Sequence, residues 1–267
     1  MLFASWPAAA QREHPIPKEL LERVAEWADA FSARMPGYAA EETLEQTVYS
    51  RGGRAGGQRR VVSDFFSVRL AESRSEFRDA VAVDGKVIQT AAQREAKWTK
   101  LLATTSTADF AALLESPNKF RLSPEYFEGL SRLVSRFATR HHDKMKYFFG
   151  ADTSDPPSRN VLIAYRQIAG DGLMLLEDKP VNPSGQAWVD PDDGHIVRIE
   201  EEVKSKDTMY YLAVEFVKPE ELGAWVPQQI TVRVIEKGRM ALENSYSYSN
   251  FRRLERPADS ATTSLPK

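Results

Sequence analysis

Apolar residues near the start of the chain recur at the spacing of a helix. Between residues 17 and 34 they return every three or four positions, which places their side chains on one helical face. Pro17 suits the first position of a helix, and Pro36-Gly37 ends it. The predicted buried stripe consists of Leu20, Val24, Trp27, Ala28 and Phe31.

The period then changes from that of a helix to that of a strand. Residues 42–90 alternate between apolar and polar positions and predict a meander of strands. Asp84-Gly85 lies between two apolar runs and predicts a tight hairpin turn. The glycine-rich stretch RGGRAGGQRR, residues 51–60, is predicted to be a flexible hairpin loop, since it lacks the lysine and hydroxyl residue of a phosphate loop. The alternative is contact with an anionic head group through Arg51, Arg54, Arg59 and Arg60.

The middle of the chain is helical in pattern. Residues 91–103 and 106–115 predict two helices. A third is predicted to begin at Ser123, which suits a cap, and Pro124, which suits the first helical position. On that third helix Arg132, Arg136 and Arg140 are predicted to form a solvated face.

Strands return from residue 145 onward. The segments NVLIAYRQI, HIVRIEEEV, TMYYLAVEFV, QQITVRVIE and MALENSYSYSNF fit half-buried antiparallel strands, mostly with one apolar and one polar face. The order of helix, strands, helical insert and strands predicts an α+β fold in which one strongly curved antiparallel sheet is covered by helices. Two domains split near residue 120 are a less economical alternative, because neither block alone has enough apolar surface.

Composition removes several classes of function. Apolar residues make up 42% of the 267 positions, which allows a sizeable core. There is no cysteine, so disulfides, thiolate metal sites and cysteine nucleophiles are excluded. The 36 basic and 38 acidic residues nearly cancel, which argues against nucleic acid as a partner. No apolar run approaches the ~20 residues that a transmembrane segment needs.

An acidic cluster offers the clearest candidate for metal binding. Asp190, Asp192, Asp193 and Gly194 could form a cation loop, but the apolar alternation after them predicts a strand where a calcium-binding loop needs a helix. Proline, aspartate and glycine are ordinary turn residues, so a turn is predicted and no metal. The adjacent His141-His142-Asp143 is predicted to lie at a helix end rather than to bind an ion.

The two ends of the chain have their own patterns. MLFASWPAAAQ resembles the end of a secretory signal, with small residues at Ala8-Ala9-Ala10 and Gln11 as the first mature residue. We therefore expect residues 1–10 to be a signal remnant and the protein to be periplasmic or secreted; an ordinary N-terminus is the alternative. Residues 11–255 are expected to form a single domain with a helical insert at about 91–145, and 256–267 a disordered tail.

Aromatic residues on the strand faces give the best candidates for ligand binding. Tyrosine combines apolar bulk with a polar tip, which suits a cavity that holds an amphiphile. Plain core packing is the alternative for any single position. The candidate cavity residues are Phe66, Tyr165, Tyr210, Phe216, Tyr246 and Tyr248.

The C-terminal half resembles a known superfamily. WVDPDDGHIVRIE, WVPQQITVRV and YSYSNFRR, with the layout of residues 17–254, are similar to the LolA-like periplasmic lipoprotein carriers. RRxxSDFxxVR, matched at Arg59–Arg69, and the YSNFRR end of xGxxxYSNFRR, matched within Ser245–Arg253, resemble an uncharacterised family of secreted bacterial proteins. The resemblance implies an incomplete β-barrel whose apolar concave face is covered by helices and binds acyl chains or other hydrophobic ligands.

Together these patterns predict an exported, non-catalytic protein that binds a lipid or other hydrophobic molecule in an apolar cavity, without a cofactor. One alternative is a cofactor-free enzyme that uses the same cavity. It would need a buried titratable group, for which Arg166 and Glu215 are the nearest candidates, although both are expected at the surface. Another alternative is an interaction module that docks a protein partner through residues 91–145.

Overall fold

The computed structural model describes residues 14–70, 73–104, 106–123, 133–150, 159–169, 174–176 and 179–254. The predicted signal remnant at 1–10, the tail at 256–267 and the predicted start of the third helix at Pro124 lie outside the described residues. No helix in the described ranges is long and apolar enough to cross a membrane.

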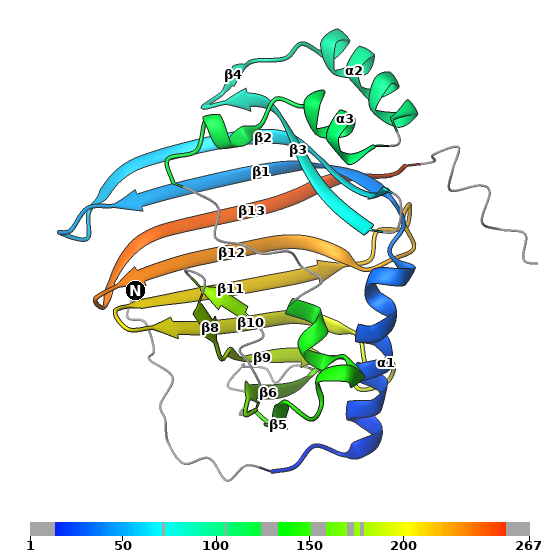
Figure 1. Cartoon of the computed structure of the whole chain (residues 1–267), viewed down its shortest axis with the longest axis vertical. Coiled ribbons are helices and arrows are strands. Elements are labelled where there is room, and N and C mark those ends of the chain that lie inside the picture. Colours follow the sequence, from blue (N-terminus) through cyan, green and yellow to red (C-terminus); the bar gives the residue numbers. More distant parts are fainter. Residues whose placement is uncertain are drawn as a thin grey trace, which may run out of the picture.

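Eleven strands form one antiparallel sheet in the order β4-β3-β2-β1-β13-β12-β11-β10-β9-β6-β5 (Figure 1). The strands before the helical insert and those after it therefore share a sheet. The strands are β1 (Tyr38–Tyr49), β2 (Ala55–Leu70), β3 (Ser73–Val83), β4 (Lys86–Val87), β5 (Met145–Phe149), β6 (Val161–Gln167), β9 (Ser184–Val189), β10 (Ile196–Ser205), β11 (Thr208–Val217), β12 (Val226–Glu236) and β13 (Arg239–Arg253). A separate pair is formed by β7 (Met174–Leu176) and β8 (Lys179–Val181).

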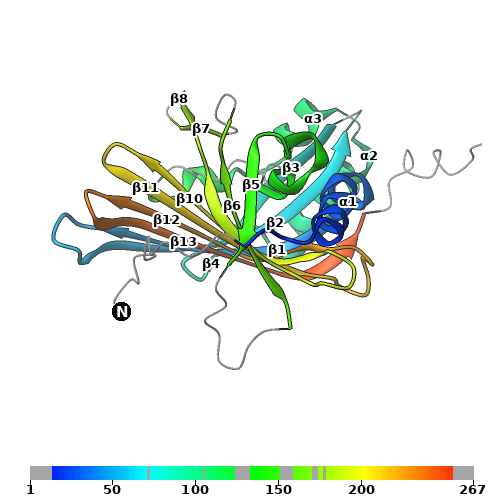
Figure 2. The same ribbon diagram turned by 90° about the horizontal axis from the view of Figure 1, so that it is seen from below.

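The sheet curves and stays open, with β4 and β5 as its two edge strands (Figure 2). The predicted curved antiparallel sheet is thus confirmed, whereas helices cover it only in part. We call the face on which Leu44, Ile230 and Tyr246 lie the inner face. The opposite face, which carries Ala39 and Phe66, is the outer face.

Helix α1 (Lys18–Arg34) packs on the inner face, as its apolar stripe predicts. Val24 is fully buried, and Phe31 lies with its ring centroid 5.8 Å from that of Phe216 in an edge-to-face contact. Trp27 contacts the same phenylalanine at 6.2 Å. An aromatic cluster therefore fixes α1 over the end of the sheet where β11 finishes.

The helical insert divides between the two faces. Helices α2 (Ala91–Ala103) and α3 (Thr107–Ala112) form where the pattern predicts them and lie on the outer face, where Phe110 and Leu101 are buried. Thr90 begins α2 with a complete capping box. Three short 3-10 helices follow: η1 (Pro117–Lys119), η2 (Ser135–Phe137) and η3 (Thr139–His141).

The predicted third helix is not continued over residues 135–141, where η2 and η3 stand in its place. Leu133, Val134, Arg136 and Phe137 are all buried, and η2 lies against α1. Neighbouring residues can be buried together only when a segment is enclosed on several sides. This segment therefore differs from a surface helix, in which only one stripe of side chains is buried.

The turns follow their residue chemistry. Asp84 and Gly85 both have positive φ, of 49° and 78°, as the predicted tight hairpin requires. In the acidic cluster the Asp192 amide donates to Asp190 Oδ1 at 2.8 Å, and β10 follows directly, so the predicted turn is confirmed. The predicted loop at 51–60 is too long, since β2 begins at Ala55 and pairs with β1.

Candidate functional site

Three rows of side chains cross the inner face from strand to strand. The row nearer α1 and the row nearer the opposite end of the strands are apolar or aromatic, whereas the row between them contains polar groups. The first row includes Leu44, Tyr246, Ile230, Val214 and Ile199. The middle row includes Gln46, Asn244, Val232, Leu212, Glu201 and Tyr165. The third row includes Val48, Leu242, Val234, Tyr210 and Val203.

Of the six aromatic candidates, Phe66 lies on the other side of the sheet from the rest. Its ring centroid is 5.0 Å from that of Trp98 and 5.7 Å from that of Phe110, both under the insert helices. It therefore does not share a surface with the five residues of the inner face. Those five are Tyr165, Tyr210, Phe216, Tyr246 and Tyr248.

The five inner-face aromatics have different surroundings. Phe216 belongs to the cluster under α1, and Tyr210 is half-buried in the third row. The Tyr248 hydroxyl donates to Glu42 Oε2 at 2.8 Å, and the Tyr165 hydroxyl donates to Glu201 Oε2 at 3.2 Å. The Tyr246 ring lies under the guanidinium of Arg121, 5.8 Å from its centroid. Four of these side chains are therefore already engaged in packing or hydrogen bonds of the fold.

Buried charges on the inner face are the main feature that the sequence pattern missed. Arg136 and Glu201 are only 4% and 3% exposed and form an ion pair with Nε and Oε2 3.0 Å apart. The prediction of a solvated arginine face is therefore wrong for Arg136. Glu42, 1% exposed, pairs with Arg78 at 2.8 Å.

The alternation of side chains along the strands already indicated that both carboxylates face the core. Glu201 lies two residues from each of Ile199 and Val203, and Glu42 two residues from Leu44, so all share the inner face. Each carboxylate binds a guanidinium and a tyrosine hydroxyl, as a buried charge requires. Arg166 and Glu215, the candidates from sequence, are exposed and half-buried.

Burial, followed by the nearby Glu201 carboxylate, raises the pKa of Tyr165, and burial and Glu42 do the same for Tyr248. A tyrosine in the unfolded chain ionises near pH 10, so unfolding above that pH releases protons that the folded state retains. The two hydroxyls therefore stabilise the fold fully below pH 10, and that contribution is lost as the pH rises further. We expect the free energy of unfolding to fall by about 1.4 kcal/mol per pH unit for each tyrosine.

Urea unfolding between about pH 9 and 11.5 measures this loss. A Tyr165→Phe, Tyr248→Phe variant should show a shallower decline than the unmodified chain. If the free energy of unfolding fell equally steeply with pH in both proteins, Tyr165 and Tyr248 would not be the cause of the loss.

Residues 117–123, which we call the cover segment, run from η1, which contacts β3, to Leu122 and Ser123, which lie on the polar middle row. Gln46 Nε2 donates to Ser123 O at 3.3 Å and to Asn244 Oδ1 at 3.0 Å, and its Oε1 accepts from the amides of Leu122 and Ser123. Arg59 donates to Phe120 O at 2.8 Å. Leu122 stays 40% exposed. Hydrogen bonds to side chains of the sheet therefore hold this segment near its C-terminal end.

One donor of the middle row has no acceptor. Asn244 is fully buried, with an exposed fraction of 0%, and its Nδ2 makes no hydrogen bond within the described part of the chain. An unpaired buried amide costs about 1–3 kcal/mol. The inner face thus offers a buried hydrogen-bond donor in its polar middle row, between two apolar or aromatic rows.

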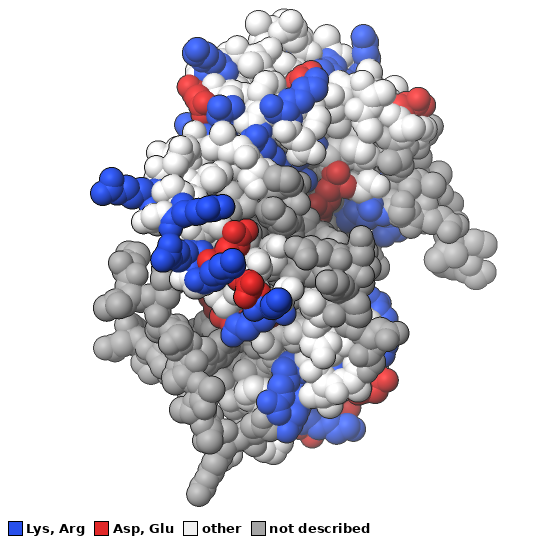
Figure 3. Space-filling model, turned by 60° about the vertical axis from the view of Figure 1, so that its left-hand side comes forward, with Lys and Arg blue, Asp and Glu red and all other residues white. Residues whose placement is uncertain are grey.

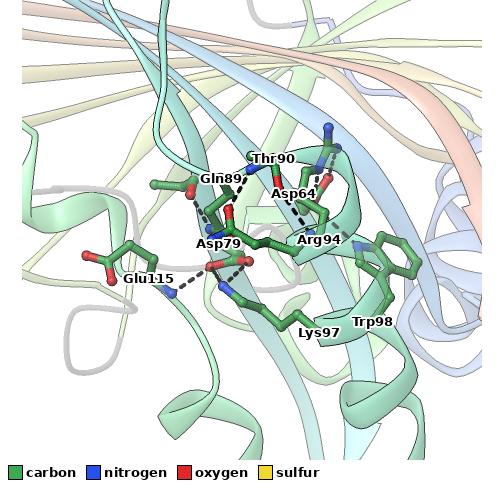
Figure 4. A network of polar contacts seen from close by, with 10 residues as sticks. Asp64, Asp79, Gln89, Thr90, Arg94, Lys97, Trp98 and Glu115 are labelled. Carbon is green, nitrogen blue, oxygen red and sulfur yellow. Dashed lines mark hydrogen bonds and ion pairs between the residues drawn. The ribbon is translucent and has the colours of Figure 1, made fainter.

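A second polar network lies on the outer face (Figure 4). Asp64 on β2 and Asp79 on β3 are direct cross-strand partners, and both are 2% exposed at the side chain. Like charges in this position repel, so each needs a cation. Arg94 donates to both oxygens of Asp64 at 3.0 and 2.5 Å, and Lys97 contacts both oxygens of Asp79 at 2.9 and 2.8 Å. The network fastens α2 to the sheet.

The two short motifs of the sequence meet beside this network. Asp64, from SDF, and Asn250 and Arg252, from SNFRR, line one cleft together with Arg94. The Arg252 guanidinium lies 4.2 Å from the centroid of Trp98, which also donates to Asp64 at 3.3 Å. Every charged group that the motifs bring here has a neighbouring partner, which favours a structural role.

The acidic turn brings potential metal ligands together but uses them in its own hydrogen bonds. Ligand atoms of Asp190, Asp193 and His195 lie within 4.8 Å of one another. Asp193 Oδ1 accepts from the His195 amide at 3.1 Å, and the imidazole stacks on Trp225 with centroids 4.1 Å apart. Burial acts to raise the pKa of Asp193, but hydrogen bonds from His195 outweigh it and lower that pKa. The cluster is explained by the turn.

Comparison with known proteins finds similarity among solved structures alone. No family model matches the sequence, and no curated protein matches it. A LolA superfamily protein from Nitrosomonas europaea is 8% identical, with a TM-score of 0.41 over 91% of this chain and 97% of that one. A putative outer membrane lipoprotein-sorting protein domain from Vibrio parahaemolyticus is 11% identical, with a TM-score of 0.42 over 92% and 95%.

A DUF1329 family protein from Desulfovibrio piger is 12% identical, with a TM-score of 0.34 over 92% of this chain and 95% of that one. The similarity to LolA-like proteins that the sequence predicts is thus found again among solved structures. Its extent is that of a shared chain layout, and neither a ligand nor an activity is carried over from it.

Proposed function

We propose that the protein binds an amphipathic molecule with an acyl chain and a carbonyl group on its inner face. The observation that carries this proposal is the fully buried Asn244, whose Nδ2 lacks an acceptor in the polar middle row, with apolar or aromatic rows on both sides. A buried donor without a partner is uncommon, and a ligand carbonyl would satisfy it. Leu44, Val232 and Tyr246 around it supply the apolar contact that an acyl chain needs.

Entry to this surface would require the cover segment to lift. The contacts between this segment and Gln46 are hydrogen bonds, each worth about 0.5–1.5 kcal/mol net, and water can replace them when the segment leaves. Gln46 would then offer a second amide to the same ligand. Export of the protein, as residues 1–11 predict, is part of this proposal and would bring it to the lipids of the cell envelope.

The test compares two pyrene-labelled probes of equal chain length, a fatty-acid methyl ester and a hydrocarbon. We expect the full chain to bind the ester about 3–10 times more tightly, since one neutral hydrogen bond is worth about 0.5–1.5 kcal/mol. Asn244→Leu should remove the preference for the ester and leave hydrocarbon binding in place. Fluorescence titration gives both dissociation constants.

Asn182→Leu, at an exposed asparagine between β8 and β9, serves as the matched control and should keep the preference. Native mass spectrometry of gently purified protein provides an independent measurement, with a co-purified lipid as the expected result. The proposal fails if neither probe binds and the purified protein is repeatedly empty.

A further inference from the structure

Three hairpin turns lie side by side at one end of the sheet, at the left of Figure 1. They join β1 to β2, β12 to β13 and β10 to β11, and these strands are neighbours in the sheet. Arg239 Nη1 donates to Arg51 O at 2.8 Å, and the Lys237 amide donates to Asp207 O at 2.7 Å. These two hydrogen bonds tie the three turns into one continuous edge.

This edge is rich in exposed cations, and we call it the basic edge. Figure 3, which turns that end of the molecule toward the viewer, shows Lys and Arg side chains gathered there with a few Asp and Glu side chains between them. Asp207 and Glu236 are the exposed acids within the three turns and their first flanking residues. The cations of the basic edge are Arg51, Arg54, Lys206, Lys237 and Arg239.

The cations of the basic edge differ from many others on the surface. Within the described residues, none of them forms an ion pair with a carboxylate. Some exposed cations elsewhere have acidic neighbours, such as Lys18 with Glu22 at 3.0 Å and Lys119 with Glu115 at 2.8 Å. The whole chain carries a formal net charge of −2, so the local excess of positive charge is not a general property of the protein.

We propose that the basic edge docks on an anionic lipid bilayer. A row of separate turns with long, exposed cationic side chains matches a planar charged surface, and clustered Lys and Arg are attracted to anionic lipids. The third inner-face row, with Val203, Val234 and Leu242, lies a few residues from these turns. A lipid that leaves the bilayer there would lie close to the inner face and would reach it once the cover segment lifts. The docking proposal rests on the proposed function, since contact with a bilayer would explain how the ligand reaches its site.

The experiment measures co-sedimentation of the full chain with two kinds of vesicle, phosphatidylcholine alone and phosphatidylcholine with about one third phosphatidylglycerol. We expect binding to the anionic vesicles only, and loss of that binding when salt rises from about 0.1 M to 1 M and screens the charges. An Arg54→Gln, Lys206→Gln, Lys237→Gln variant removes one cation from each turn. The partition coefficient of this variant between anionic vesicles and solution should fall about a hundredfold.

A Lys18→Gln, Lys100→Gln, Lys218→Gln variant changes the net charge equally at exposed positions away from the basic edge and should bind like the unmodified chain. Equal losses in the two variants would overturn the proposal, because net charge alone would then explain binding. Binding of poly-glutamate or single-stranded DNA, without binding to vesicles, would overturn it in favour of an acidic protein or a nucleic acid.

The pyrene-ester titration without vesicles separates this proposal from the function on which it rests. If the variant of the basic edge still binds the ester but not the vesicles, both proposals stand. If the unmodified chain binds the ester and ignores anionic vesicles, the docking proposal alone fails. If it binds vesicles and no ester, the function fails and the basic edge remains a membrane contact.

Discussion

Replacing Arg136 by methionine is expected to lower the free energy of unfolding by about 3–5 kcal/mol, because Glu201 then keeps a buried charge without its cation. Both side chains are almost fully buried, and Arg136 is supplied by η2 while Glu201 lies on β10. The pair therefore joins the segment around η2 to the sheet. Urea unfolding at neutral pH measures the loss.

Two further variants decide whether the loss comes from the uncompensated charge. Arg136→Met combined with Glu201→Leu should recover most of the stability, since replacing a whole buried ion pair by apolar residues is often neutral or favourable. Arg198→Met is the matched control, because that arginine is 38% exposed and pairs with Glu200 and Glu215 near the surface. It should cost at most about 1 kcal/mol. A similar cost for Arg136→Met and the control would refute the role of burial.

Phe66→Ala is expected to cost about 3–5 kcal/mol of stability and to leave binding of the pyrene ester unchanged, because Phe66 packs on the outer face. Its neighbour Phe65 provides a matched comparison, since both rings are 1% exposed but lie on opposite faces. Phe65 packs with Tyr38 and Tyr248 instead.

A double-mutant cycle with Trp98→Ala tests this placement directly. Phe66→Ala and Trp98→Ala remove the same contact, so their effects should not be additive. The stability cost of the double variant should differ from the sum of the two single costs by about 0.5–3 kcal/mol. Phe65→Ala and Trp98→Ala act in different clusters and should add within about 0.5 kcal/mol. Additive costs for the first pair would show that Phe66 does not contact Trp98.

The inner face packs the fold in a way that the aromatic pattern did not reveal. Tyr165 and Tyr248 hold buried carboxylates, and Phe216 packs under α1, so these aromatics complete the folded core. The surface that the proposal assigns to a ligand lies instead around Asn244, beneath the cover segment. An asparagine within an aromatic and apolar strand face was the available signal, because burial without a partner is costly.

The sequence by itself determined many of the elements and several of their turns. Helices α1 and α2, the hairpin at Asp84-Gly85 and the acidic turn before β10 all form where local periodicity and turn chemistry predict them. These features depend on residues only a few positions apart, so they can be predicted from the local sequence. Alternation along β11 likewise placed Tyr210 and Phe216 on one face.

Only the tertiary structure decided which face each apolar set would use. On β2 both Phe65 and Phe66 are buried, because α1 lies on one side of the sheet and α2 with α3 on the other. Alternation separates such residues into two sets but cannot say which partner covers either set. The burial of Arg136 was likewise undetermined, since its partner Glu201 is 65 residues away and a local pattern contains no information about so distant a contact.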